Sequence, residues 1–287
     1  MQGSPSGPSY STWGEAEQRG SAWWRSHPQP NTQNQTNTLR GYLERWPQLG
    51  RANKEVYVGT SGYDYYWNKR RPSAFEWYLS QGFNSVEINA TFYRWPSPPM
   101  VNVWVHAPNH FRFSFKVNRS ITHYSKLSKR ATELWEKFSE SLKPLHPKTL
   151  FWLYQMPPSF TYTTSNMHRV NDYFSTLNHQ EVAVVEFRSP EWWKHVGELA
   201  ESGVVFCSVD APGLPNDIVA INNTVYLRLH GRTEWYSYVY TQRELDQIVE
   251  ALNVTRAKNI GVYLNNDEGM LENGLYLARR LIHKHLK

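Results

Sequence analysis

The chain has 287 residues and a formal net charge of +6, which allows one large domain with room for an extension. Its single cysteine, Cys207, excludes an internal disulfide and any cysteine-rich metal site within one chain. No run approaches the roughly 18 apolar residues of a membrane-spanning helix, and the polar N-terminus lacks an apolar signal region, so we expect a cytoplasmic protein without a membrane partner. The basic excess favours an anionic partner, although ordinary surface lysine and arginine would give the same balance.

Residues 1–55 differ in composition from the rest of the chain. Residues 1–11 are rich in glycine, proline and serine, and residues 27–38 are rich in proline, asparagine, glutamine and threonine. Segments of this kind rarely build a core. We therefore predict a polar, partly ordered, irregular N-terminal extension over residues 1–55, followed by one folded domain over residues 56–287.

Eight short strand-like runs follow the extension, and most of the segments between them are long enough for a helix. Strands that alternate with helices imply right-handed crossovers and a parallel sheet. Eight such units predict an α/β fold, a (β/α)8 TIM-type barrel, whose active-site face lies at the carboxyl ends of the strands. The predicted strands are 56–59, 85–89, 113–117, 150–155, 182–186, 204–209, 225–229 and 261–264. The predicted helices are 72–81, 99–106, 129–142, 166–177, 191–201, 241–252 and 268–285, with none between the sixth and seventh strands.

Alternation within these runs assigns polar side chains to one face of the strands near their carboxyl ends. In residues 225–230, Arg228 and His230 share a face opposite three apolar residues. The same reasoning turns Asp210 of the sixth strand toward the barrel axis and Cys207 toward the outside. Seven of the eight strands would direct a polar group inward, whereas a purely structural barrel fills these positions with branched apolar residues.

The strand-end motifs, taken in order, resemble those of the YecE-like family, number 72 among the domains of unknown function. The motifs are residues 58–63 with Trp67, 86–94, 115–117 with 121–123, 155–160, 185–188, 209–210, 227–231 and 265–267. The resemblance spans about residues 56–285, and eight ordered motifs make it specific. It implies a TIM-type barrel but no particular activity, because the family is named for lacking one. Leu264 departs from the pattern, since the family more often has phenylalanine there.

The candidate site consists of the polar residues at these strand ends. Four are predicted to be catalytic, because carboxylates and an imidazole can serve as acid and base: Glu87, Glu186, Asp210 and His230. The predicted substrate-binding residues supply cations, amides and aromatic rings: Tyr63, Trp67, Asn89, Lys116, His123, Gln155, Arg188, Arg228, Asn265, Asn266 and Asp267. Structural roles are the alternative, because Glu186 could pair with Arg188 or Arg228, and Asn266 could cap the last helix.

Three functions fit these residues. The leading prediction is nuclease-like hydrolysis of a phosphoester bond in nucleic acid, with a single strand or a phosphorylated small molecule as the partner. The second is hydrolysis of a carbohydrate or small molecule by the paired carboxylates Glu87 and Glu186. The third is a non-catalytic module that binds an anion or nucleic acid. No cofactor is expected; a divalent metal on Glu186, Asp210 and His230 is an alternative that the neighbouring cations disfavour.

Overall fold

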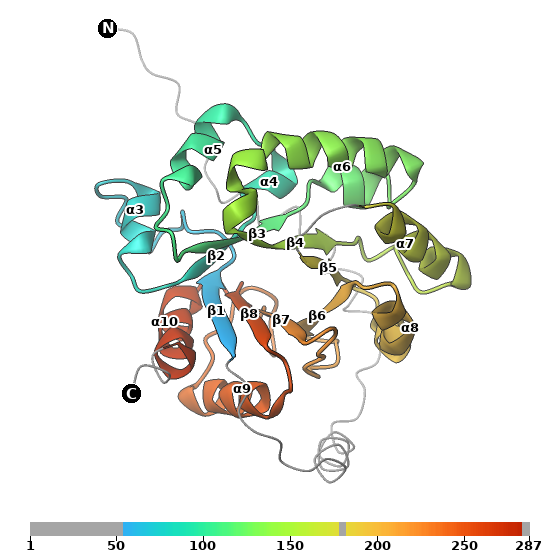
Figure 1. Cartoon of the computed structure of the whole chain (residues 1–287). Coiled ribbons are helices and arrows are strands. Elements are labelled where there is room, and N and C mark those ends of the chain that lie inside the picture. The colour runs from blue at the N-terminus through green and yellow to red at the C-terminus, as the bar shows by residue number, and fades with distance from the viewer. Residues whose placement is uncertain (1–53, 178–181, 283–287) are drawn as a thin grey trace, which may run out of the picture. The chain divides into compact units, whose positions relative to one another are not determined.

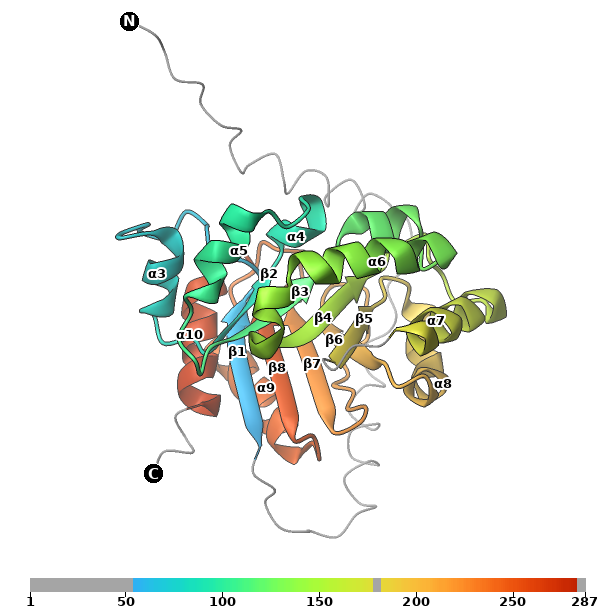
Figure 2. The same cartoon turned by 45° about the horizontal axis from the view of Figure 1, so that its top comes forward.

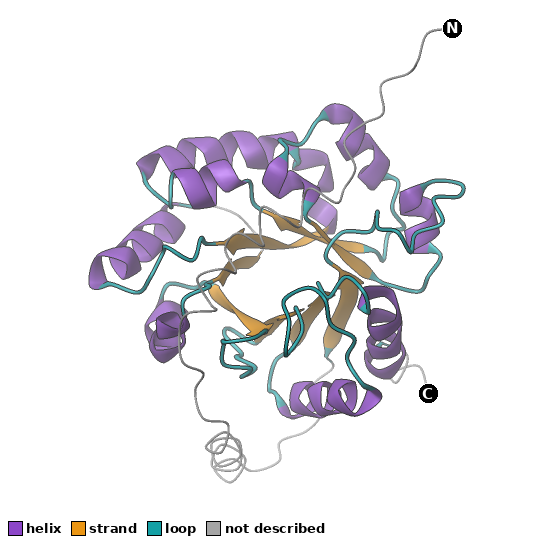
Figure 3. Ribbon diagram, turned by 180° about the vertical axis from the view of Figure 1, so that it is seen from behind, coloured by secondary structure: helices purple, strands orange, loops and turns teal. Residues whose placement is uncertain are grey.

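The computed structural model describes residues 54–177 and 182–282, and the predicted extension lies outside them except for its last two positions. In this part of the chain, eight strands form a ring with helices around it (Figures 1 and 3). The strands are β1 (Glu55–Thr60), β2 (Ser85–Ile88), β3 (Arg112–Lys116), β4 (Thr149–Gln155), β5 (Val182–Glu186), β6 (Val205–Asp210), β7 (Thr224–Leu229) and β8 (Asn259–Leu264). All pair in parallel, in the order β1-β8-β7-β6-β5-β4-β3-β2.

The ring closes between β1 and β2 near their carboxyl ends (Figure 2). Ser61 and Glu87 form a parallel bridge, and the backbone N–H of Gly62 donates to the carbonyl oxygen of Glu87 at 2.7 Å. Gly59 permits this approach, because a Cβ at that position would collide with the carbonyl oxygen of Ser85. The predicted (β/α)8 barrel is therefore confirmed.

The outer layer consists of eight α-helices and three short helical turns within the described residues. The α-helices are α3 (Ala74–Leu79), α4 (Ala90–Tyr93), α5 (Pro98–Val105), α6 (Lys129–Ser141), α7 (Thr164–Thr176), α8 (Val196–Glu201), α9 (Gln242–Val254) and α10 (Met270–Leu281). The turns are η3 (Ser120–Tyr124), η4 (Lys143–Lys148) and η5 (Pro190–His195). The predicted helix 191–201 is divided between η5 and α8, and β6 connects to β7 without a helix, as expected. No described helix is long and apolar enough to cross a bilayer.

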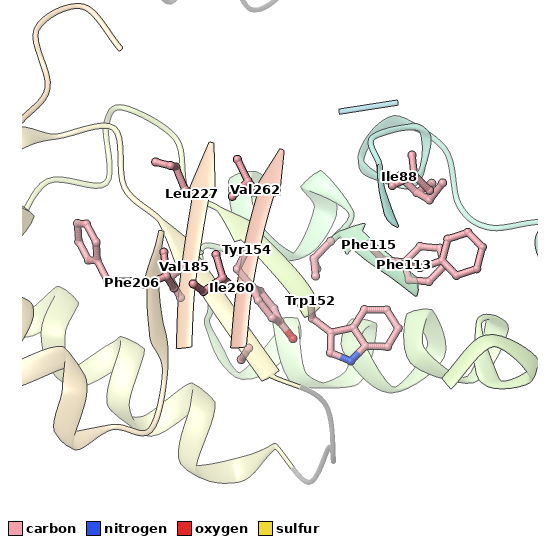
Figure 4. Close-up of a cluster of buried hydrophobic side chains, with 14 of the residues drawn as sticks. Ile88, Phe113, Phe115, Trp152, Tyr154, Val185, Phe206, Leu227, Ile260 and Val262 are labelled. Atoms are coloured by element: carbon pink, nitrogen blue, oxygen red, sulfur yellow. The ribbon is translucent and has the colours of Figure 1, made fainter. Parts of the chain in front are cut away.

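Large apolar side chains fill the space between the outer faces of the strands and the helices (Figure 4). Trp152 of β4, for example, meets Trp135 of α6 edge to face, with ring centroids 5.1 Å apart. The aromatic residues of this layer account for much of the unusual tryptophan and tyrosine content. Because they lie outside the ring, the inward positions near the carboxyl ends of the strands are left to polar side chains.

The orientation of β6 differs from the prediction. The Cys207 Sγ lies 3.9 Å from Glu186 Oε2 inside the ring, whereas Phe206 packs outside against Trp193, with ring centroids 4.6 Å apart. Cys207 therefore faces the axis, and Asp210, three residues later, faces away from it. The prediction was wrong because it assigned the face with polar residues to the axis, whereas in β6 the apolar face of Val205, Cys207 and Val209 lies inside the ring and Phe206 of the other face packs outside.

Candidate functional site

Arg228 lies at the centre of the polar cluster, between two carboxylates. Its Nη1 donates to Glu186 Oε2 at 2.6 Å, and its Nη2 donates to Glu87 Oε1 at 2.8 Å. Nη2 also donates to Ser61 Oγ at 2.8 Å. All four side chains are fully buried, and they come from β2, β5, β7 and the end of β1. The guanidinium is therefore shared by the two carboxylates and joins four parts of the ring.

Glu87 has hydrogen-bond donors at both carboxylate oxygens. Besides Arg228, Ser61 Oγ donates to Oε1, and the Tyr226 hydroxyl donates to Oε2 at 2.6 Å. Tyr226 is in turn held by Ser114 Oγ at 2.7 Å. This arrangement makes Glu87 an anchor of the network. Sequence reasoning missed Ser61, which continues the inward alternation of Gly59 beyond the predicted end of the strand.

Glu186 faces a second guanidinium in addition to Arg228. Its Oε1 lies 2.6 Å from Arg188 Nε, in the geometry of an ion pair rather than of an aligned hydrogen bond. Burial alone would raise the pKa of Glu186, but Arg188, Arg228 and Lys116 together hold it below the usual range of a glutamate. Glu186 is therefore a carboxylate at neutral pH.

Arg188 and Lys116 supply two further positive charges at the carboxyl end of the ring. The Arg188 guanidinium lies 4.6 Å above the ring of Trp235, and its Nη2 donates to the Tyr236 hydroxyl at 3.4 Å. Lys116 Nζ lies 4.4 Å from the ring centroid of Phe92. Both cations are almost completely buried. The loop between β7 and α9 therefore contributes directly to the site through Trp235 and Tyr236.

His230 is held between Arg228 and Asn265. Arg228 Nη1 lies 3.2 Å from His230 Nε2, and the Asn265 amide lies 3.2 Å from His230 Nδ1. Burial, reinforced by the charges of Arg228, Arg188 and Lys116, lowers the pKa of His230 well below its usual value, so the ring is neutral at pH 7. Because arginine can only donate, Nε2 accepts and the ring proton resides on Nδ1. The atom of Asn265 that faces Nδ1 is Nδ2, so this tautomer requires the side-chain amide of Asn265 to be turned with its oxygen toward the proton.

Asp210 does not join this cluster, contrary to the prediction. Its two oxygens accept hydrogen bonds from Arg232 Nε at 3.1 Å and from the Tyr240 hydroxyl at 3.2 Å. Burial raises the pKa of Asp210. The three-residue metal set of Glu186, Asp210 and His230 is consequently not assembled, and no other group of three such ligands occurs in residues 54–177 and 182–282.

Asn89 and Gln155 place amide groups at the edge of the cluster. Asn89 Nδ2 donates to the carbonyl oxygen of Ser61 at 3.2 Å, and Gln155 pairs in register with Glu186. Within the described part of the chain, the side-chain carbonyl oxygens of both amides are buried and accept no hydrogen bond. They are acceptors that a ligand with N–H or O–H groups could use.

Two of the predicted aromatic binding residues pack into the outer layer instead. The Tyr63 hydroxyl accepts a hydrogen bond from Trp104 Nε1 at 3.0 Å, and its ring packs on Phe75. Trp67 stacks on Tyr65, with ring centroids 5.5 Å apart. Both side chains are therefore used to pack α3 and α5 against the barrel, and their predicted contact with a ligand has no support from this geometry.

The last three predicted binding residues lie at different depths. His123, in η3, contacts the same Phe92 ring as Lys116, with ring centroids 5.0 Å apart. Asn266 Nδ2 donates to the backbone of Tyr238 at 2.8 Å, so this residue holds the β7–α9 loop. Asp267 is half-buried in the turn before α10. Of the three, His123 is the one placed beside the cluster.

The fold and the site define a TIM-type barrel with a buried charged cluster at the carboxyl ends of its strands. Residues 57–286 match the family described as "Protein of unknown function DUF72", and the chain belongs to this family. A solved DUF72 family protein from Thermotoga maritima MSB8 is 27% identical, with a TM-score of 0.68, over 79% of this chain and 99% of that chain. A second, from Enterococcus faecalis V583, is 24% identical, with a TM-score of 0.67, over 79% of this chain and 96% of that chain. No curated protein matches the chain. The predicted family and its barrel fold are confirmed.

Proposed function

We propose that the cluster binds a phosphate group and that the protein hydrolyses a phosphoester bond of nucleic acid at this end of the barrel. One observation carries the proposal: three almost completely buried cations, Lys116, Arg188 and Arg228, converge on the carboxylate of Glu186. Three cations brought together away from water form an environment that an anionic group stabilises.

The contacts suggest how the work is divided among the cations. Arg228 is engaged by both carboxylates, so its main role is to hold them. Lys116 and Arg188 are the proposed phosphate ligands, because they are the cations at the outer edge of the network. Their charges would also stabilise the negative charge that develops on the phosphoryl and leaving oxygens.

Glu186 is the proposed base that takes a proton from the attacking water. Its Oε2 is fixed by Arg228, and its Oε1 faces Arg188, the proposed phosphate ligand. The water oxygen would bond to phosphorus as the bond from phosphorus to the leaving oxygen breaks. His230 is less suited to this step, because Arg228 and Asn265 engage both of its ring nitrogens, whereas Glu186 Oε1 accepts no hydrogen bond in the described part of the chain. We assign His230 to positioning Arg228.

The alternative of a glycoside-type hydrolase fits the geometry less well. Such an enzyme needs one protonated carboxylic acid, whose pKa is raised above its usual value. Here Arg228 binds both Glu87 and Glu186, and the pKa of Glu186 is lowered. A phosphorylated small molecule remains the alternative substrate for the same cluster.

The test is hydrolysis of a small aryl phosphodiester and of labelled single-stranded and duplex oligonucleotides, with and without EDTA. The proposal predicts hydrolysis that persists in EDTA and falls by at least about 100-fold in Lys116→Met and Glu186→Gln. Lys137→Met, an exposed lysine of α6, is the matched control and should retain full activity. Absence of phosphoester hydrolysis, or equal activity in all the variants, would refute the proposal. Loss of activity in EDTA would refute its metal-free form.

A further inference from the structure

The loops at the carboxyl end of the barrel have unequal charges. The loops after β1, β2 and β3 hold six cations, Lys69, Arg70, Arg71, Arg94, Arg119 and Lys126, and one carboxylate, Asp64. The loops after β4 to β8 hold three cations, Arg188, Lys194 and Arg232, and five carboxylates, Glu191, Asp217, Glu234, Asp267 and Glu268. The cations of the first group are exposed except for Lys126, which is half-buried. One side of this end of the barrel is therefore strongly basic.

Exposed aromatic side chains are found on the same side. Six large apolar residues are exposed in the described ranges, and the three aromatic ones all lie in the loops after β1, β2 and β3. Tyr66 is 74% exposed, Tyr124 is 71% exposed and Trp95 is 36% exposed. Arg119 lies 5.7 Å from the ring centroid of Tyr124, which places a cation beside an accessible ring.

These three loops form one continuous arc next to the site. β2 pairs with β3, and the Ser61–Glu87 bridge joins β1 to β2, so the loops are neighbours on the ring (Figure 1). Lys116 at the end of β3 lies over Phe92 of α4, within the loop after β2. The arc therefore leads to one of the two proposed phosphate ligands.

We propose that this arc is the docking surface for single-stranded nucleic acid. Bases stack on Tyr124 and on Tyr66, which borders the acidic loop after β8, and phosphates pair with the cations of the three loops. The inference rests on the proposed function, and it specifies that the nucleic acid is single-stranded and which loops bind it. A single strand presents both phosphates and open base faces. A duplex hides the faces of its bases. A peptide of acidic residues would match the charge of the arc, but its side chains have no rings to stack on the exposed aromatic residues.

Fluorescence anisotropy with a labelled oligothymidylate, measured over a range of salt concentrations, tests the inference. Lys69→Ala with Arg119→Ala should make the log–log salt dependence less steep by about 0.7 for each phosphate that is no longer neutralised. Lys137→Ala with Lys258→Ala removes the same charge from α6 and from the residue before β8, and should leave the slope unchanged. Equal effects of the two double variants would overturn the inference.

The stacking component has its own matched pair of variants. Tyr66→Ser and Tyr124→Ser should each weaken binding by about 5- to 150-fold, whereas Tyr66→Phe and Tyr124→Phe keep the ring and should bind like the wild type. Thermal melts establish that each variant is folded. Binding of a duplex or of polyglutamate as tight as that of the single strand would overturn the inference.

Anisotropy detects binding without turnover, so the two proposals can fail separately. If the wild type hydrolyses the small phosphodiester and the arc variants bind the oligonucleotide normally, the docking surface is refuted and the proposed function stands. If oligonucleotide binding depends on the arc but no phosphoester is hydrolysed, the docking surface is supported and the proposed function is refuted.

Discussion

Arg228 shows how one residue can serve both the fold and the site. Its guanidinium pairs with two fully buried carboxylates, Glu87 and Glu186, the second of which also faces Arg188. The cost of burying an ion pair is offset only while both partners are present. The same residue fixes Glu186 and contacts His230, so its position determines the geometry of the proposed base.

Arg228→Ala should therefore lower the free energy of unfolding by about 3–5 kcal/mol, because it leaves Glu87 and Glu186 buried without their shared partner. Glu186→Gln should cost less, because Arg228 keeps Glu87 as a partner and Arg188 alone loses the carboxylate that it faces. Urea denaturation of the variants beside the wild type measures both effects. A loss below about 1 kcal/mol in Arg228→Ala would show that the network contributes little to stability.

The pH dependence of stability should reveal the neutral state of His230. The folded-state pKa of His230 lies well below the unfolded value of 6.5, so folding favours the unprotonated ring. The contribution of His230 to the free energy of unfolding is fully present above the unfolded pKa. It is lost as the pH falls below about 6.5 toward the lowered folded pKa. Glu186 acts in the same direction at lower pH, starting below about 4.5.

His230→Gln should therefore flatten the decline in unfolding free energy between about pH 7 and about pH 5. Urea denaturation at several pH values compares the two slopes. An unchanged slope in the variant would mean that His230 keeps its ordinary pKa and that the ring is not shielded as the geometry indicates.

At the scale of elements, the β7–α9 loop links the site to the outer wall of the barrel. Arg232 and Tyr240 bind Asp210, and this contact holds the loop that places Trp235 over Arg188. Gly231, at the start of the loop, has a φ of +115°. A Cβ there would collide with Tyr238 and with the backbone of Glu234.

Gly231→Ala should displace this loop and weaken phosphate binding together with stability. Gly203→Ala is the matched control, because Gly203 also has a positive φ, of +78°, but has open space where a Cβ would lie. Both variants incur the backbone strain, on the order of 1–3 kcal/mol, and the collision affects Gly231 alone. Equal phosphate affinity in the two variants would show that the loop position does not matter for the site.

The elements were predictable to the extent that their sequence patterns were distinct. β7 has one apolar and one polar face, so Arg228 and His230 were assigned correctly to the axis. The capping box of Thr241 and Glu244 marks the start of α9. In β6 the same rule failed, because the apolar face that includes Cys207 lies inside the ring while Phe206 of the mixed face packs outside on Phe187 and Trp193. α4 and η3 are too short to show a helical period.

At the scale of the whole molecule, the sequence could locate the site but not the pairing of its charges. Glu87 and Arg228 are separated by 141 residues and meet only because the ring closes. Alternation along each strand predicts which side chains point inward, but it contains no information on which strands stand opposite each other across the axis. The uneven charge of the loops likewise becomes an arc only when β1, β2 and β3 are placed side by side.

The central claim is that the cluster is an anion site and not merely a set of paired buried charges. Titration of the protein with inorganic phosphate, followed by calorimetry, tests this claim most directly. We predict saturable binding at one site, weakened at least about tenfold in Lys116→Met and unchanged in Lys137→Met. Absence of phosphate binding, or equal binding by the two variants, would contradict the claim and leave the cluster with a structural role alone.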